Sequence, residues 1–149
     1  DYHVDNLMLL PKRDGVRRCG LLDFQDARIG PAAYDLASLL EDARRTLPDS
    51  LRCTLYSRYV AAFSDLDEAS FLRWFNVLAT QRHAKVAGIF VRLCVRDGKS
   101  KYLRHIPRVV AYLQAHLAQP ELAPVAQWLC DHCPDLTQPL PPLKQAAGT

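Results

Sequence analysis

The sequence lacks the features that mark membrane, secreted and nucleic-acid-binding proteins. No apolar run approaches the roughly 20 residues that a helix needs to cross a bilayer, and the first residues do not have the layout of a signal peptide. The net charge is only +3, and lysine and arginine are spread along the chain. The five cysteines stand at irregular spacing, which does not fit a disulfide framework. We therefore expect a cytoplasmic protein with neither a membrane nor a nucleic-acid partner.

Several motifs of catalysis and metal binding are also missing. The serines have no Gly-x-Ser-x-Gly setting, which argues against a serine hydrolase. Cys130 and Cys133 form a single Cys-x-x-Cys pair without a second half-site, so a zinc centre is not expected. No glycine-rich phosphate-binding loop is present. What remains is a chain of 149 residues, 49% hydrophobic and 23% charged, which fits about one globular domain.

The N-terminal residues predict a β-hairpin. Apolar runs cover residues 7–10 and 16–24, and Asp14-Gly15 between them is a strong turn signal. A hairpin brings its two ends together. Asn6, which enters the first strand, and Asp23, which leaves the second, are therefore expected to be neighbours.

The rest of the chain is predicted to be helical, because apolar residues recur at helical spacing between proline and Asp-Gly breaks. Phe71, Trp74, Phe75 and Leu78 share one face of the longest segment, and we interpret them as core residues. The predicted helices cover residues 32–46, 51–62 with Asp49 or Ser50 as the cap, 68–96 with Gly88 as a point for a bend, 102–118 and 122–132.

A hairpin followed by helices predicts an α+β fold without repeats or a second domain. We expect one lobe over residues 1–133, made of a hairpin segment (1–31) and a helical substrate subdomain (32–133). The proline-containing residues 134–149 are expected to form a loose tail.

Side chains with oxygen atoms gather around the predicted hairpin. Asn6 and Asp23 offer an amide oxygen and a carboxylate at its open end. This suits Mg²⁺, which takes few protein oxygens and completes its coordination with water and phosphate. Asp1 precedes Asn6 in a loop, where a carboxylate can orient and deprotonate a hydroxyl that attacks a phosphate. These residues predict Mg²⁺-dependent phosphoryl transfer.

The spacing Asp1-x-x-x-x-Asn6, followed by Leu22-Asp23-Phe24, resembles the catalytic and metal-binding segments of the protein-kinase-like fold. Protein kinases have Asp-Phe-Gly where this chain has Asp-Phe-Gln. The resemblance implies that the chain is the C-terminal, mainly helical lobe of that fold, with the catalytic and metal segments on its N-terminal hairpin. It also implies that Asp1 is the catalytic base and that Asn6 and Asp23 hold Mg²⁺ against the phosphates of ATP.

A longer pattern is similar to the aminoglycoside phosphotransferase and choline kinase branch of this fold. It consists of Leu-Asp-Phe-Gln-Asp at residues 22–26, then Gly30-Pro31, then Tyr-Asp-Leu-Ala at residues 34–37. The resemblance implies that Asp35 braces the catalytic loop from a helix start, where a carboxylate is electrostatically favoured. Asp26 either supports the metal ligands or accepts hydrogen bonds from loop amides. His3 either contacts a phosphate or substrate or forms a local hydrogen bond.

The helix predicted over residues 68–96 carries a stripe of cations. At about 100° per residue, Arg82, Lys85, Arg92 and Arg96 fall within a narrow arc beside an apolar one. Such a stripe disfavours a polycationic aminoglycoside and suits a neutral or acidic acceptor, so Arg82, Lys85 and Arg92 are candidate substrate contacts. The alternative is a solvated face or arginines paired with acids.

The stretch Gln-Arg-His-Ala-Lys at residues 81–85, with the segments around it, is similar to the bacterial anomeric sugar kinases of cell-wall recycling. The resemblance implies an amino-sugar acceptor, such as N-acetylmuramate or N-acetylglucosamine, phosphorylated at the anomeric hydroxyl. The lactyl carboxylate of muramate would give the cationic stripe a partner. An aminoglycoside or choline as acceptor stays open. So does another class, a non-catalytic helical binding module that retains kinase-like segments.

In this family the glycine-rich hairpin and the lysine strand that hold ATP precede the catalytic loop, and this chain contains neither. The resemblance therefore implies that the chain works with an N-terminal lobe of the same protein. We expect residues 1–149 alone to bind nucleotide poorly and to transfer little phosphate.

Overall fold

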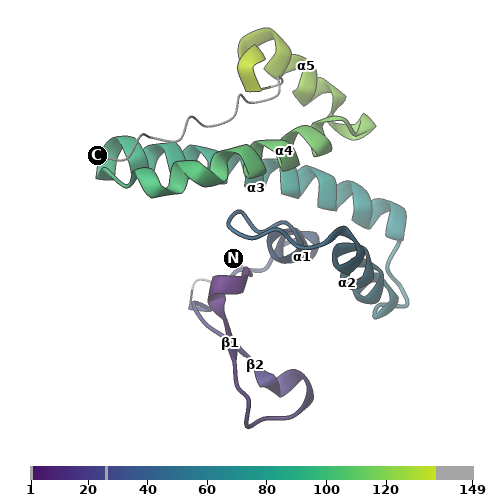
Figure 1. Cartoon of the computed structure of the whole chain (residues 1–149). Coiled ribbons are helices and arrows are strands. Elements are labelled where there is room, and N and C mark those ends of the chain that lie inside the picture. Colours follow the sequence, from purple (N-terminus) through teal and green to yellow (C-terminus); the bar gives the residue numbers. More distant parts are fainter. Residues whose placement is uncertain (1, 26, 137–149) are drawn as a thin grey trace. The chain divides into compact units, whose positions relative to one another are not determined.

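The computed structural model describes residues 2–25 and 27–136 (Figure 1). Asp1, Asp26 and residues 137–149, most of the predicted tail, lie outside the described residues. The described chain is mainly helical with one two-stranded sheet, which confirms the α+β composition. It forms two compact units, residues 1–78 and 79–149. The divisions predicted after residues 31 and 133 stay predictions.

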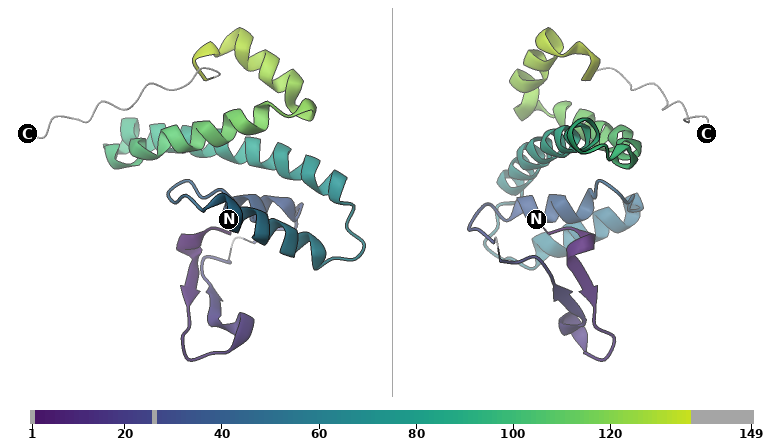
Figure 2. Two further views of the ribbon diagram at one scale, coloured as in Figure 1. Left: turned by 45° about the vertical axis from the view of Figure 1, so that its right-hand side comes forward. Right: turned by 90° about the vertical axis from the view of Figure 1, so that its left-hand side faces the viewer.

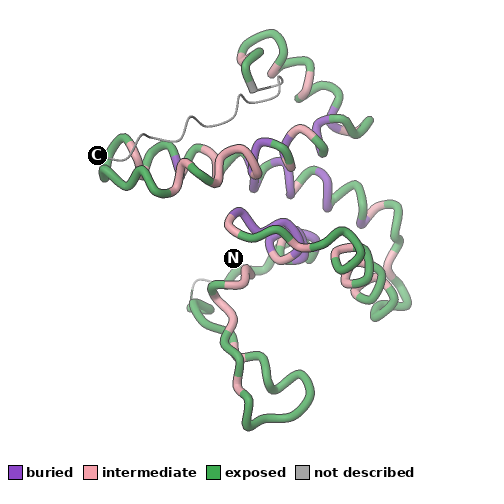
Figure 3. The backbone as a smooth tube through the Cα atoms, in the orientation of Figure 1, coloured by how far each residue is buried: buried purple, intermediate pink, exposed green. Residues whose placement is uncertain are grey.

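The first unit begins with the predicted hairpin in a shorter form. Strands β1 (Leu7–Leu9) and β2 (Cys19–Leu21) pair antiparallel, with Met8 opposite Gly20. Both views of Figure 2 show the two strands side by side. In Figure 3 the hairpin is coloured mostly as exposed. The strands therefore hold the segments at their open end in register without burying much surface of their own.

The connection between the strands differs from the tight Asp-Gly turn that was predicted. Gly15 has a φ of 55° and opens a 3-10 turn, Gly15–Arg18. The amide of Leu10 closes this longer loop with a 2.7 Å hydrogen bond to the Arg18 carbonyl. The second strand consequently starts later than its apolar run.

Helix α1 (Ala33–Leu40) ends before the predicted limit of residue 46. Asp42 supplies the reason, because its Oδ1 accepts hydrogen bonds from the backbone amides of Arg44 at 2.6 Å and Arg45 at 3.0 Å. An aspartate that binds amides beyond itself stabilises a turn in place of a further helical turn.

Helix α2 (Asp49–Ala61) packs against α1 and the beginning of α3. Asp49 does not cap it, but lies in its first turn and forms a 3.1 Å ion pair with Arg52. The ring of Tyr56 lies 6.0 Å from that of Phe71 and 5.8 Å from that of Phe75. The buried apolar residues of this unit are Ala33, Leu36, Ala37, Leu40, Ala43, Phe71 and Phe75.

Helix α3 (Glu68–Asp97) has almost the predicted length. Its start is capped by Asp67, whose carboxylate accepts a 3.1 Å hydrogen bond from the Ser70 amide. The interpretation of Trp74 as a core residue was wrong, because it is 53% exposed whereas Phe71 and Phe75 are buried. Trp74 lies about 100° from Phe75 around the helix, at the edge of the buried face.

The second unit holds the rest of α3, α4 (Ile106–Leu117) and α5 (Ala123–His132). A 3-10 turn over residues 100–105 replaces the predicted first turns of α4. Stacked rings join α3 to the chain around α4: His83 lies 5.2 Å from Tyr112, and Phe90 lies 5.5 Å from Tyr102. The buried apolar residues of this unit are Ala79, Phe90, Val109, Val110, Leu113, Leu117 and Leu122.

None of the helices within the described residues combines the length and the apolar character that crossing a bilayer requires. All five cysteines lie in the described part of the chain, and their thiols are free.

Candidate functional site

A cavity of about 410 Å³ lies at the open end of the hairpin, next to the start of α1. It brings together three residues that the sequence had singled out, Asn6, Asp23 and Asp35. Its other lining residues are Tyr2, Leu21, Leu22, Phe24 and Ala27. The cavity therefore presents two carboxylates and one amide beside an apolar wall.

Strand pairing explains why Asn6 and Asp23 meet there. The amide of Leu22 donates a 2.8 Å hydrogen bond to the Asn6 carbonyl, one step beyond the pair formed by Leu7 and Leu21. The residue after Leu22 is Asp23, so its carboxylate leaves the sheet next to Asn6. The expected proximity of these two residues is present in the structure.

Asp23 has an unusual backbone conformation. Its φ is 56°, in the left-handed region that non-glycine residues seldom adopt, although aspartate tolerates it better than most. Its Oδ1 accepts a hydrogen bond from the side-chain amide of Gln25. Strained residues of this kind concentrate at functional sites, where the surrounding structure holds them in place.

Tyr2 and Asp35 also line the cavity. Asp35 lies in the first turn of α1, as predicted. Burial raises the pKa of Tyr2 above its ordinary value, and the nearby Cys19 thiol and the charge of Asp35 raise it further. The Tyr2 hydroxyl is therefore protonated at neutral pH and can donate a hydrogen bond.

His3, Asp1 and Asp26 are the other residues predicted for this segment. The Nδ1 atom of His3 accepts a 3.3 Å hydrogen bond from the Asp5 amide, which is the local contact that was one of its two alternatives. This bond caps the 3-10 turn Val4–Asn6. Asp1 and Asp26 lie outside the described residues, and their roles stay predictions.

The cationic stripe on α3 belongs to the second unit and is not uniform. Arg82 is buried, whereas Lys85 and Arg92 are exposed. Arg96 forms an ion pair with its neighbour Asp97, with a 2.6 Å contact between Nε and Oδ1. Lys85 and Arg92 thus remain the accessible cations of the predicted substrate contacts.

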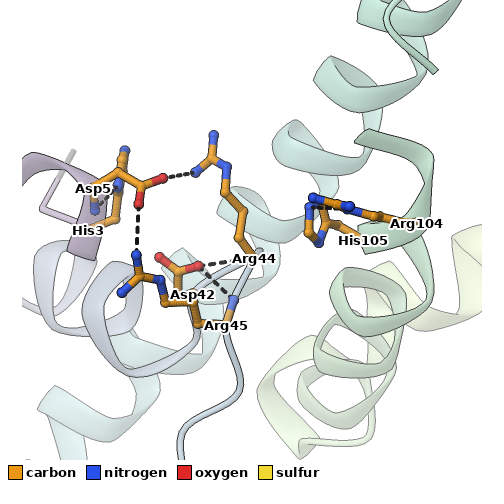
Figure 4. A network of polar contacts seen from close by, with 7 residues as sticks. All are labelled: His3, Asp5, Asp42, Arg44, Arg45, Arg104 and His105. Atoms are coloured by element: carbon orange, nitrogen blue, oxygen red, sulfur yellow. Dashed lines mark hydrogen bonds and ion pairs between the residues drawn. The ribbon is translucent and has the colours of Figure 1, made fainter. Parts of the chain in front are cut away.

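Sequence reasoning missed a group of charged residues that connects Asp5 with the turn after α1 (Figure 4). Asp5 forms ion pairs with Arg44 and Arg45, both at 3.4 Å, and Asp42 binds the backbone amides of the same two arginines. Asp5 and Arg45 are far apart in the sequence, so no local spacing rule connects them. The one signal in the sequence was Asp42, an aspartate within the pattern of the predicted helix.

Comparison with known proteins supplies the family. A sequence model described as "Phosphotransferase enzyme family" matches residues 1–75, which contain the hairpin, the cavity and α1. The chain belongs to this phosphotransferase family. The resemblance that the sequence suggested is thereby confirmed.

Comparison with individual curated relatives shows which members of the family this chain resembles. The chain is 43% identical over 134 residues to the N-acetylmuramate/N-acetylglucosamine kinase of Caulobacter vibrioides, an alignment that covers 90% of this chain and 37% of the relative. It is 47% identical over 132 residues to the enzyme of the same name from Neisseria meningitidis serogroup B, covering 84% of this chain and 38% of the relative. It is 40% identical over 136 residues to the Pseudomonas aeruginosa enzyme of that name, covering 87% of this chain and 39% of the relative. This chain thus spans less than two fifths of the length of each of these three relatives.

Proposed function

We propose that this chain is the catalytic-loop and acceptor-binding part of an ATP-dependent kinase of amino sugars, acting on N-acetylmuramate and N-acetylglucosamine. The observation that carries the proposal is the identity of 40 to 47% to three kinases of that name, over 84 to 90% of this chain. Family membership alone supports phosphotransfer to a hydroxyl. The named relatives favour an amino sugar over choline or an aminoglycoside as the acceptor.

The donor atoms of the cavity fit a divalent cation. Asn6 offers an amide oxygen, and Asp23 and Asp35 offer carboxylates around a space of about 410 Å³. Oxygen donors without sulfur or imidazole suit Mg²⁺. In the proposed roles Asn6 and Asp23 hold the ion, and it would neutralise charge on the phosphate oxygens of ATP. Asp35 and Tyr2 also line the cavity, and their proposed role is to keep these ligands oriented.

Asp1 is the proposed general base. A carboxylate that precedes Asn6 in the loop can accept the proton of the acceptor hydroxyl as the hydroxyl attacks the phosphate. His3 and Asp26 keep supporting roles in this proposal. The hydrogen bond from the Asp5 amide to His3 Nδ1 fixes the turn that carries Asn6, which supports such a role for His3.

The acceptor contacts are proposed for the stripe on α3. Lys85 and Arg92 are exposed and can reach an anionic ligand, whereas Arg82 is buried and is better suited to holding its neighbours in place. The carboxylate of N-acetylmuramate would interact with these cations. N-acetylglucosamine has no such group, so the stripe is expected to affect the two sugars differently.

We propose further that activity needs the part of a longer protein that corresponds to the rest of the relatives. The chain spans only 37 to 39% of three of them, and it contains no glycine-rich phosphate loop. The protein is proposed to act in the cytoplasm. The free thiols of its five cysteines agree with a reducing compartment.

An acceptor panel tests the function. The full product of the gene that encodes this chain is incubated with ATP, Mg²⁺ and one acceptor at a time: N-acetylmuramate, N-acetylglucosamine, choline or an aminoglycoside. We expect turnover on the two amino sugars. Turnover on choline or the aminoglycoside alone would replace the proposed substrate class. Binding of ATP without turnover on any acceptor would favour a non-catalytic module.

A further inference from the structure

The ion pairs of Asp5 with Arg44 and Arg45 link two segments that are distant in the sequence. Asp5 directly precedes Asn6 in the 3-10 turn Val4–Asn6. Arg44 and Arg45 lie in the turn that follows α1. We call Asp5, Asp42, Arg44 and Arg45 the loop clamp (Figure 4).

Each of the two arginines contacts a different oxygen of the Asp5 carboxylate. Nη1 of Arg44 lies 3.4 Å from Oδ2, and Nη2 of Arg45 lies 3.4 Å from Oδ1. Each pair alone would be weak, because the Asp5 side chain is 44% exposed and those of Arg44 and Arg45 are 36% and 60% exposed. Contacts on both oxygens restrict the rotation of the carboxylate more than one pair could.

Asp42 holds the backbone of both arginines. It is only 1% exposed, and its Oδ1 accepts the amides of both Arg44 and Arg45. A buried carboxylate is costly unless hydrogen bonds satisfy it, and these amides supply two. The hydrogen bonds to Asp42 thus hold the backbone of the arginine pair independently of the side-chain contacts with Asp5.

The turn held by the clamp also carries a cavity residue. The amide of Asn6 donates a 2.9 Å hydrogen bond to the His3 carbonyl, and the Asn6 carbonyl accepts the Leu22 amide. Asn6 is therefore fixed on the backbone from both sides, and the clamp holds the residue immediately before it. A shift of Asp5 would change the angle at which the Asn6 amide oxygen enters the cavity.

We propose that the loop clamp is a positioning device that sets the Asn6 oxygen for cation binding. None of its members is among the residues that line the cavity, so they are positioning residues. The proposal rests on the proposed role of Asn6 and Asp23 as Mg²⁺ ligands. The clamp ties the Asn6 turn to the segment directly after α1, the helix that carries Asp35, so one structural unit orients both residues.

Asp5→Asn in the full gene product tests the clamp, because it removes the charge and keeps the size of the side chain. Asp49→Asn is the matched control, since Asp49 also forms an exposed pair with an arginine, at 3.1 Å. Substitution of a side chain that orients a metal ligand typically weakens metal affinity by about 10-fold to 100-fold. We expect Asp5→Asn to raise the Mg²⁺ concentration for half-maximal rate about tenfold, with an unchanged acceptor KM. Asp49→Asn is expected to leave both values unchanged.

Two further variants separate positioning from folding. Asp5→Glu keeps the charge and is expected to recover most of the Mg²⁺ dependence. Arg44→Ala combined with Arg45→Ala is expected to shift the Mg²⁺ dependence like Asp5→Asn, and adding Asp5→Asn to that pair should produce little extra change. An equal Mg²⁺ dependence for Asp5→Asn and Asp49→Asn would overturn the proposal. So would additive effects of Asp5→Asn and the arginine pair.

Hydrogen exchange keeps this test distinct from that of the function. Asp5→Asn should speed exchange of the Asn6 and Leu7 amides, and Asp49→Asn should not. Unchanged exchange at these amides would overturn the clamp even in an active enzyme. If the wild-type protein transfers no phosphate to any acceptor, the proposed function fails, and with it the catalytic purpose of the clamp. Faster exchange in Asp5→Asn would then establish only a structural link.

Discussion

Asn6 and Asp23 line the same cavity, although Asn6 precedes the first strand of the hairpin and Asp23 follows the second. The hydrogen bond from the Leu22 amide to the Asn6 carbonyl holds this arrangement in the backbone. The site's central pair therefore depends on strand pairing and not on the packing of a large core. Changes at either side chain should affect chemistry more than folding.

Asp23→Ala in the full gene product tests the proposed metal ligand. Loss of the carboxylate should lower kcat/KM by at least about 100-fold, because a bound metal supplies several kcal/mol of charge stabilisation. The measurement is phosphate transfer as a function of Mg²⁺ concentration. Asp14→Ala is the control, since Asp14 is an exposed carboxylate in the loop between β1 and β2. Equal activity of the two variants would exclude Asp23 from the metal site.

Asp1→Asn tests the general base. A positioned base contributes about 10²-fold to 10⁴-fold to the rate, so kcat should fall within that range. Nucleotide affinity should change little, because the asparagine neither adds bulk nor removes a proposed metal ligand. Single-turnover rates and ATP binding are measured in parallel. A variant that loses ATP binding and keeps its single-turnover rate would assign Asp1 to nucleotide binding.

The pKa of Tyr2 predicts a pH effect on stability. Burial, then Cys19 and Asp35, raise it in the folded protein above the ordinary tyrosine value of about 10. The folded state therefore favours the protonated hydroxyl. This contribution to stability is complete below about pH 10 and is lost as the pH rises through the folded-state pKa.

Phenolate absorbance of the wild-type protein minus that of Tyr2→Phe isolates the titration of Tyr2. The midpoint should lie above the ordinary value, and the free energy of unfolding should fall over the same pH range. Tyr59→Phe provides a matched control for the removal of one hydroxyl. A Tyr2 midpoint at or below pH 10 would show that its hydroxyl is not in the surroundings described.

The core of the first unit can be tested by a pair of leucines. Leu36 is 6% exposed and Leu9 is 70% exposed. Leu36→Ala should lower the free energy of unfolding by about 2–5 kcal/mol, whereas a surface substitution such as Leu9→Ala should stay within about 0.5 kcal/mol. Denaturant unfolding of both variants measures the difference. Similar losses for both would contradict the burial of α1.

Local patterns in the sequence were sufficient for much of this fold. The apolar runs located both strands, and helical spacing located α3 within a residue of its observed end. The proximity of Asn6 and Asp23 followed from the hairpin alone. The connection between the strands was mispredicted, because a 3-10 turn follows Gly15 and the amide of Leu10 binds the Arg18 carbonyl, which closes a longer loop.

Other features depend on contacts that no local pattern encodes. The early end of α1 requires Asp42 to bind amides beyond itself, although its position continues the helical pattern. The exposure of Trp74 depends on which segments pack against α3, and helical spacing alone does not determine that. The pairing of Asp5 with Arg44 and Arg45 joins segments that only the folded chain brings together.

The product of the reaction tests the central claim most directly. The full gene product is incubated with ATP, Mg²⁺ and N-acetylmuramate, and the phosphorus NMR spectrum identifies the position of the transferred phosphate. Our account predicts a sugar 1-phosphate that forms only with Mg²⁺ and is absent with Asp23→Ala. Phosphate on a different hydroxyl, or hydrolysis of ATP without a phosphorylated sugar, would contradict it.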